Sequence, residues 1–268
     1  MDLGDMGSGA GDVGDKKLSG AESEYTPDEP ACHESPAIPH HPESPDTARP
    51  GPDGNGHSDK RDGLGERRRN AVLAGYRPGD DPEAWSDDPD PGIRALAVGA
   101  LFRAGRFGPD TAARALDDPD AVVRRRGATL AGHDLSASSR HADVLIPLLI
   151  DALGDPDPLV AEAVAWALGE TGDETAADVA VDALCDVAAG HDDPLVRESA
   201  VAALGAIGAP RSLDVVLDAL DGPPALRRRA AVALAAFDDR RAAAGLARCL
   251  DDRDWLVRQA AEELLRND

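Results

Sequence analysis

Residues 193–208 decide the fold, and they read Asp193-Pro194-Leu195-Val196-Arg197-Glu198-Ser199-Ala200-Val201-Ala202-Ala203-Leu204-Gly205-Ala206-Ile207-Gly208. An acidic residue next to Pro is followed by an Arg that opens an Ala- and Leu-rich stretch. Its apolar residues recur at i, i+4, i+7, i+8 and i+11, which is one stripe along a helix. Because Pro cannot continue a helix, the acidic Pro turn separates this helix from the one before it.

The same step from an acidic turn to an anchor residue occurs six times. The anchors are Arg94, Arg124, Ala161, Arg197, Arg227 and Arg258, separated by 30, 37, 36, 30 and 31 residues. Periods of this size indicate stacked supersecondary units rather than one globular core. The sequence therefore predicts an all-α solenoid of about six helical hairpins. A partial unit containing residues 67–75 precedes the first anchor.

A second set of helices fills the intervals between the anchor helices. We expect these helices at residues 111–116, 141–153, 176–189, 213–220 and 241–250, with at most a one-turn helix within 77–86. Each ends before the next acidic turn, whose Asp can cap the following helix. The last helix carries Glu262, Glu263 and Arg266, as the capping unit of a solenoid requires.

These units resemble HEAT repeats, specifically the short type found in phycobilin lyases. The pattern of that group is Asp-Pro-x-x-x-Val-Arg-x-x-Ala-Ala-x-Ala-Leu-Gly-x-Ile-Gly, and residues 193–208 and 156–172 match it closely. The resemblance implies a right-handed α-solenoid over residues 66–268. The same repeats occur in scaffolds, lyase-type proteins and iron hydroxylases, so the fold does not fix the function.

Composition divides the chain near residue 65. Residues 1–65 hold 8 of the 21 Pro and 11 of the 27 Gly, with 14 acidic and 5 basic residues. Such a segment buries too little apolar surface to offset its chain entropy, so we expect a disordered acidic tail. Residues 66–268 are rich in Ala, Leu and Val, as packed helices require.

The net charge of −23 rests on 38 Asp and 13 Glu, while only Lys16, Lys17 and Lys60 are lysines. This bias resembles that of proteins from halophilic archaea, in which high salt screens the self-repulsion of the chain. The alternative is Ala, Arg and Asp usage driven by a GC-rich genome.

The three cysteines, Cys32, Cys185 and Cys249, are widely spaced and odd in number, which favours reduced thiols. The N-terminus lacks the charged and apolar regions of a signal peptide. No apolar run approaches the ~20 residues that span a bilayer. We therefore expect a cytoplasmic protein that does not bind membranes.

The acidic turns and the anchors predict an Arg–Asp ladder along the stack, because such residues join neighbouring units in HEAT repeats. The expected members are Arg94, Arg124, Arg197, Arg227 and Arg258 with Asp88, Asp118, Asp155, Asp192 and Asp252. Charge-assisted hydrogen bonds between units would hold the repeats together. Ala161 should break the ladder in the third unit.

In this family the anchor helices line the concave face, and the residues after each anchor should be exposed there. The expected binding residues are Arg125, Arg126, Glu162, Trp166, Glu198, Arg228 and Arg229. The face is then basic at both ends and acidic in the middle. Clustered Arg can bind carboxylate or phosphate in a bidentate manner. The alternative is a solvated charged face without a ligand.

Trp166 lies five residues after Ala161, in the middle of this face. Trp is enriched in binding hot spots, so Trp166 could anchor a partner. It also matches the Ala-Trp-Ala-Leu-Gly string common in the family, where the ring packs between units. Both interpretations stay open at this stage.

The sequence favours binding over catalysis. The only His-Glu pair, His33-Glu34, lies in the tail, whereas iron-dependent hydroxylases of this repeat type carry such pairs on their repeats. The nearby Cys32, His40 and His41 match no zinc spacing, so no metal and no cofactor are expected. An acidic repeat region argues against nucleic acid. We expect a non-catalytic scaffold that binds a protein on its concave face; the alternative is a phycobilin-lyase-like protein that handles a chromophore. The oligomeric state is open.

Overall fold

The computed structural model describes residues 58–172 and 174–267, and all regular secondary structure there is helical. The α-helices are α1 Ser58–Leu73, α2 Pro91–Arg103, α3 Pro109–Leu116, α4 Ala121–Ala137, α5 Ala142–Ala152, α6 Pro158–Gly169, α7 Glu174–Gly190, α8 Pro194–Ile207, α9 Leu213–Asp218, α10 Pro224–Leu234, α11 Arg240–Arg248 and α12 Trp255–Asn267. Five 3-10 helices complete the set: η1 Pro82–Trp85, η2 Ser139–His141, η3 Pro210–Ser212, η4 Ala219–Asp221 and η5 Cys249–Asp251.

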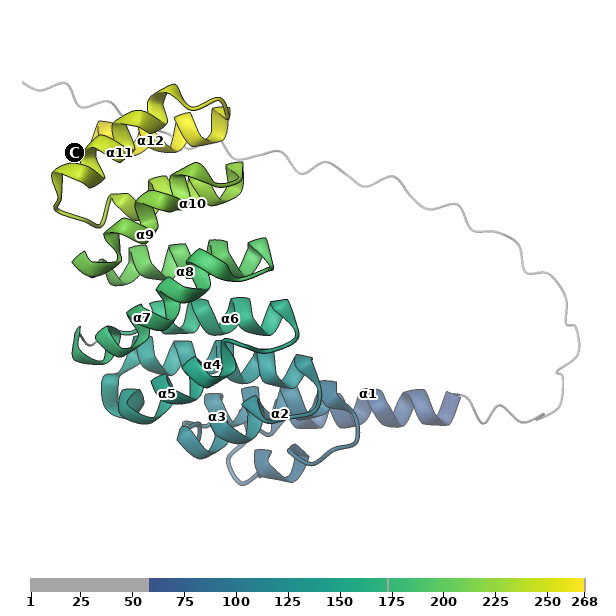
Figure 1. Cartoon of the computed structure of the whole chain (residues 1–268). Helices are drawn as coiled ribbons and strands as arrows, with labels where there is room; N and C mark the ends of the chain where they lie inside the picture. Colours follow the sequence, from purple (N-terminus) through teal and green to yellow (C-terminus); the bar gives the residue numbers. More distant parts are fainter. Residues whose placement is uncertain (1–57, 173, 268) are drawn as a thin grey trace, which may run out of the picture. The chain divides into compact units, whose positions relative to one another are not determined.

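The helices form two layers. The anchor helices α2, α4, α6, α8, α10 and α12 contact one another in chain order, with α1 against α2, and we call them the B layer. The intervening helices η1, α3, α5, α7, α9 and α11 form the A layer. Figure 1 shows α6, α8, α10 and α12 stacked one upon the next. Six pairs and a single N-terminal helix confirm the predicted α-solenoid, and the second helices lie where the sequence placed them.

The turns before the B helices begin them as expected. Pro occupies the first turn of α2, α6, α8 and α10, where its missing N–H costs nothing. The side chains of Asp90, Asp120, Asp157 and Asp193 accept a backbone N–H in the first turn of the helix that each one caps. In the first unit the A helix is reduced to the single turn η1, in agreement with the weak pattern of residues 77–86.

Helix α1 begins at Ser58, so the predicted boundary at residue 65 lies inside this helix. The disordered tail is expected over residues 1–65, and residues 1–57 of that range lie outside the described residues. Polar and charged composition hid the start of α1, because no apolar stripe marks it.

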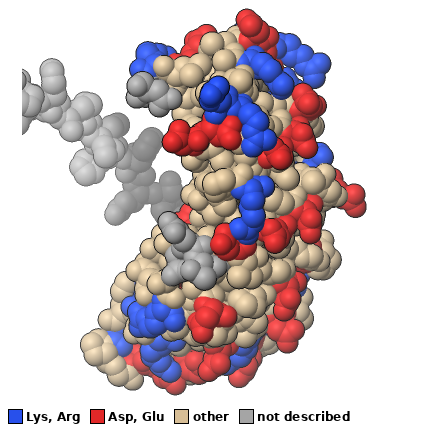
Figure 2. Space-filling model, turned by 60° about the vertical axis from the view of Figure 1, so that its left-hand side comes forward, with Lys and Arg blue, Asp and Glu red and all other residues tan. Residues whose placement is uncertain are grey.

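The surface of the stack carries charges of both signs. On the face shown in Figure 2, acidic and basic side chains adjoin in several places between tan surface. Of the described residues, only Arg227 among the charged side chains is buried, with 5% of its surface exposed. Burial of a lone guanidinium is costly, so this residue must have partners.

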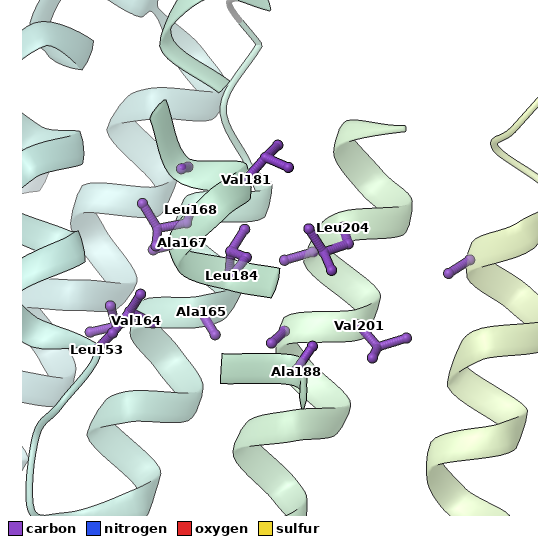
Figure 3. Close-up of a cluster of buried hydrophobic side chains, with 14 of the residues drawn as sticks. Leu153, Val164, Ala165, Ala167, Leu168, Val181, Leu184, Ala188, Val201 and Leu204 are labelled. Carbon is purple, nitrogen blue, oxygen red and sulfur yellow. The ribbon is translucent and has the colours of Figure 1, made fainter. Parts of the chain in front are cut away.

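The core lies between the two layers. In the middle units it includes Leu153, Val164, Leu168, Val181, Leu184, Val201 and Leu204, which come from α6, α7 and α8 and the turn before α6 (Figure 3). Each unit buries its apolar stripe against its neighbours rather than in a separate core, as expected of a solenoid.

Small residues let successive B helices approach closely. A Cβ on Gly205 would lie 2.5 Å from Ala233 Cβ and 2.6 Å from Ala233 Cα on the next B helix. The same relation joins Gly169 to Ala203 and Gly132 to Ala167. Gly205 therefore serves as a contact inside α8, and the helix ends only at Gly208, which has φ of 66°.

Candidate binding face

The turns before α2, α4, α6 and α12 each hold two acidic residues with different tasks. The second caps the helix, as described above. The first lies two residues earlier: Asp118 Oδ1 accepts the backbone N–H of Asp120 at 2.9 Å. Asp155 and Asp252 accept the equivalent bond at 2.9 and 2.7 Å. This bond orients the carboxylate so that both of its oxygens face the B helix of the preceding unit.

The two carboxylate oxygens accept hydrogen bonds from the anchor Arg of the preceding unit. Arg94 donates from Nε and Nη2 to Asp118 at 2.8 and 2.7 Å, and from Nη1 to the carbonyl oxygen of Asp88 at 2.9 Å. Each guanidinium thus ties its own turn to the next one. The pairs built in this way are Arg94–Asp118, Arg124–Asp155 and Arg227–Asp252, and Arg67–Asp88 at 2.9 Å precedes them. We call this series the Arg–Asp ladder.

The ladder shifts the pKa values of its members in the directions that paired charges require. The hydrogen bond from Arg94 lowers the pKa of Asp118, and that from Arg227 lowers the pKa of Asp252. For Asp155, burial raises the pKa but the hydrogen bonds from Arg124 and from the Asp157 amide outweigh it, so its pKa is lowered as well. All three carboxylates therefore stay ionised in the folded chain.

The ladder is interrupted after Asp155, and both partners change there. Ala161 replaces the Arg, as the sequence indicated, and His191 takes the place of the Asp. His191 Nδ1 accepts the Asp193 N–H at 3.0 Å, the same bond that the ladder carboxylates accept. Asp192, which we expected in the ladder, is exposed and forms no ion pair with the described residues. The prediction of Asp192 was wrong because the ladder position lies six residues before the anchor, and that residue is His191.

A second interruption follows at Arg197. Its Nε is buried and has no hydrogen-bond partner among the described residues. Asp221 lies six residues before Arg227, as the ladder carboxylates lie before their anchors, but it is the last residue of η4, is exposed, and pairs with Arg248 at 3.7 Å rather than with Arg197. Arg227 Nη1 donates to the Gly222 carbonyl oxygen, as Arg94 does to that of Asp88. Arg197 thus lacks its expected acidic partner.

Arg258 forms the hydrogen bond to its own turn but no ion pair with a carboxylate of a following turn. It donates from Nη1 to the Asp252 carbonyl oxygen at 2.6 Å. It belongs to the last B helix, so no further turn follows among the described residues to supply a carboxylate.

The charged residues predicted for the binding face lie on the free face of the B layer, which is the face turned away from the A layer. Arg125 and Arg229 are exposed, and Glu162, Glu198 and Arg228 are half-buried. None of these five side chains forms an ion pair within the described residues. Arg229 and Val232 line a shallow hollow of about 290 Å³ between α8 and α10, with Ala202 and Ala206.

Trp166 lies on this face but is half-buried rather than fully turned outward. Its ring covers Gly132, whose added Cβ would lie 2.7 Å from Trp166 Cζ3, and it meets the His133 ring edge-on at 5.3 Å. His133 in turn lies 6.3 Å from Phe102. The ring therefore packs between α4 and α6 while keeping part of its surface free.

Sequence reasoning missed Arg103, which meets Arg126 on the same face. A Cβ on Gly99 would lie 2.8 Å from Arg126 Nη2 and 3.4 Å from Arg103 Nη1, so the two guanidiniums converge over this glycine. Burial, followed by the charge of Arg103, lowers the pKa of Arg126. Arg103 is the last residue of α2, where a basic side chain is ordinary, and no spacing rule sets it apart.

A second series of ion pairs, also missed, joins the A layer. Arg106 bonds Asp81 at 2.8 Å, Arg114 bonds Glu83 at 2.5 Å, and Arg241 bonds Asp214 at 2.6 Å. Arg211 bonds Asp178 and, at 3.1 Å, Asp182. These side chains are exposed, so each pair contributes little to stability. They pair most of the arginines of the A layer, while exposed acidic side chains such as Asp143 and Asp151 on α5 form no ion pair within the described residues.

The next question is which metal-binding or nucleophilic side chains the described residues bring together. Within residues 58–172 and 174–267, no three His, Cys, Asp or Glu side chains gather as metal ligands. Burial raises the pKa of the Cys249 and Cys185 thiols, so neither is a thiolate at neutral pH. The Cys32, His33, His40 and His41 group lies outside the described residues. No described helix is both long and apolar enough to cross a bilayer.

Comparison with known proteins agrees with the fold. YibA from Escherichia coli is 19% identical and superposes with a TM-score of 0.55 over 77% of this chain and 74% of its own. An engineered protein is 18% identical, with a TM-score of 0.53 over 75% of this chain and 63% of its own. The complex of CpcE and CpcF of phycocyanin lyase from Nostoc sp. PCC7120 is 24% identical, with a TM-score of 0.49 over 71% and 77%.

At these identities the likeness to YibA and to the engineered protein shows the fold alone. No curated protein sequence matches the chain. A family model described as HEAT repeats matches residues 109–186 and 181–266, which is more than half of the chain. The chain therefore belongs to the HEAT-repeat family.

Proposed function

We propose that this chain is a non-catalytic adaptor that binds another protein through the free face of its B layer. One observation supports the proposal above all: Arg125, Glu162, Glu198, Arg228 and Arg229 gather on this face without ion-pair partners among the described residues. The arginines of the turns and of the A layer, in contrast, are largely paired. Unpaired charges of both signs on one face can attract and orient a partner whose surface carries the complementary charges.

Apolar surface accompanies these charges. Val232 is 52% exposed, and it lies in the same position of its helix as Trp166 and Ala202 in theirs. A partially exposed aromatic and aliphatic row surrounded by charges is the usual composition of an interface core with a polar rim. Because the B helices repeat, an extended partner segment could contact several units in succession.

Capture of the partner by immobilised full-length chain tests this function. We expect the double variant Glu162→Lys, Glu198→Lys to lose the partner that the unaltered chain retains. The matched control is Asp143→Lys, Asp151→Lys, which reverses two exposed charges on α5 in the A layer. Equal retention by both variants would show that the partner does not use this face.

A further inference from the structure

Arg103 and Arg126 approach each other from neighbouring B helices over a position without a side chain. Arg103 reaches toward α1: its Nη2 donates to the Val72 carbonyl oxygen at 3.4 Å, and its guanidinium carbon lies 4.9 Å from the centre of the Tyr76 ring. Arg126 reaches back from α4. Their terminal nitrogens therefore meet above Gly99.

Neither guanidinium has an acidic partner within the described residues, although the chain has 51 acidic residues against 28 basic ones. Both side chains are half-buried, and Arg103 Nε is buried without a hydrogen-bond partner there. Two like charges held close together in partial burial repel each other, which favours the binding of an anion between them. The lowered pKa of Arg126 has the same physical origin.

We propose that Arg103 and Arg126 form an oxyanion site that takes a carboxylate side chain from an acidic segment of the protein partner. The proposal rests on the adaptor function inferred above and names the chemistry that one end of the face recognises. Two planar guanidiniums offer several N–H donors in fixed directions, which suits a carboxylate better than a point charge would. Gly99 lets the two guanidiniums lie against α2, because a Cβ there would meet Arg126 Nη2 at 2.8 Å.

The position of the site favours a peptide segment over an isolated small molecule. Tyr76, which steadies Arg103, is 66% exposed, and Arg125 and His133 beside Arg126 on α4 are exposed as well. The pair thus lies on an open face, whereas small-molecule sites are concave and enclose most of their ligand. An extended segment could place one acidic side chain over Gly99 and continue along the face toward Trp166.

The direct test is fluorescence anisotropy with a labelled peptide in which Glu alternates with Gly, and with the matched peptide in which Gln replaces Glu. We expect the full-length chain to bind the Glu peptide and to bind the Gln peptide far more weakly. Arg103→Gln and Arg126→Gln should each weaken binding about tenfold or more, as loss of a charged hydrogen bond implies. The control Arg253→Gln removes an exposed charge from the turn before α12 and should change affinity less than about twofold.

An internal carboxylate tests the site without any ligand. Gly99→Asp places an oxyanion beside both guanidiniums, and Gly99→Asn is its neutral match of the same shape. We expect the Asp variant to melt at a higher temperature than the Asn variant, and the difference to disappear when Arg126→Gln is added. The Asp variant should also lose the Glu peptide, because its own side chain occupies the site.

Several results would overturn the proposal: absence of Glu-peptide binding, equal binding by the Arg103→Gln, Arg126→Gln double variant, or an Asp variant no more stable than the Asn variant. Binding of a phosphoserine peptide in place of the Glu peptide would assign the site to phosphate instead. If these tests fail while partner capture still depends on Glu162 and Glu198, the results contradict the oxyanion site and leave the adaptor function standing. If partner capture fails while the Glu peptide binds, the results contradict the adaptor function.

Discussion

At the scale of single residues, the ladder shows how two substitutions can depend on each other. Where Ala161 removes the guanidinium, His191 removes the carboxylate, and the turn keeps its shape because His191 Nδ1 accepts the same N–H bond. A carboxylate left at this place would be partly buried without its cation, which is costly. The paired change avoids that cost.

Restoring both ladder residues tests this dependence. Ala161→Arg alone should destabilise the fold, because Ala161 is fully buried and the new guanidinium faces an imidazole. His191→Asp alone should also destabilise it. The double variant should recover about 1–3 kcal/mol of coupling free energy, measured by urea unfolding in a double-mutant cycle. Additive losses would mean that the two positions do not form a ladder pair.

The ladder carboxylates also make a prediction about acid. Because Arg94 lowers the pKa of Asp118 in the folded chain, this carboxylate stabilises the fold fully above its unfolded pKa of about 3.9 and loses that contribution as pH falls through the folded value. The free energy of unfolding should therefore drop as pH falls below ~4. Asp118→Asn should lower stability at neutral pH and make this acid-induced drop smaller. An unchanged drop in the variant would assign it to other groups.

At the scale of helices, close contact between B helices explains the role of a glycine inside α8. Gly205 follows Leu204 and resembles a helix stop, yet it lies inside α8 and touches Ala233 of α10. The role of Gly205 depends on the backbone of the neighbouring helix α10, and no local sequence pattern shows that contact.

Substitution of two helical glycines should therefore have opposite effects. Gly205→Ala should destabilise the stack by about 1–3 kcal/mol, because the added methyl would overlap the Ala233 backbone. Gly63→Ala, in α1, meets nothing within 4 Å and should stabilise the fold by up to about 1 kcal/mol through helix propensity. Thermal melting of both variants checks the signs; a stabilising Gly205→Ala would show that α8 and α10 are farther apart.

The same scale separates what sequence could predict from what it could not. The helices, the acidic turns and the residues that form three ladder pairs could be predicted from the sequence, since capping acts within a few residues and the anchors recur periodically. Arg103 and Arg126 belong to different helices, and their meeting over Gly99 depends on how α2 and α4 stack. The missing partner of Arg197 depends on the shape of the turn at η4, which leaves Asp221 exposed beside Arg248. Neither turn shape nor helix stacking leaves a periodic signal.

At the scale of the whole molecule, the two series of ion pairs complement each other. The ladder is absent between α6 and α8 and between α8 and α10, where Gly169–Ala203 and Gly205–Ala233 contacts bring the helices together. Arg211 joins η3 to α7 in the A layer across the second of these gaps. The middle of the stack therefore relies on close packing, while its ends also rely on buried or half-buried charge pairs.

Net charge sets the last prediction, because the described part of the chain remains strongly acidic after its ion pairs are formed. Self-repulsion opposes the compact state, and salt screens it: the Debye length falls from ~10 Å at 0.1 M to ~3 Å at 1 M. We therefore expect the melting temperature, followed by circular dichroism, to rise between about 0.1 and 2 M KCl. Salt also weakens exposed ion pairs such as Arg241–Asp214, but these contribute little. The half-buried ladder is screened less, so the gain from reduced repulsion should dominate.

Sodium sulfate at equal ionic strength, compared with KCl, separates screening from the general strengthening of apolar burial. A flat profile in KCl would favour genomic composition over adaptation to salt as the origin of the acidic sequence.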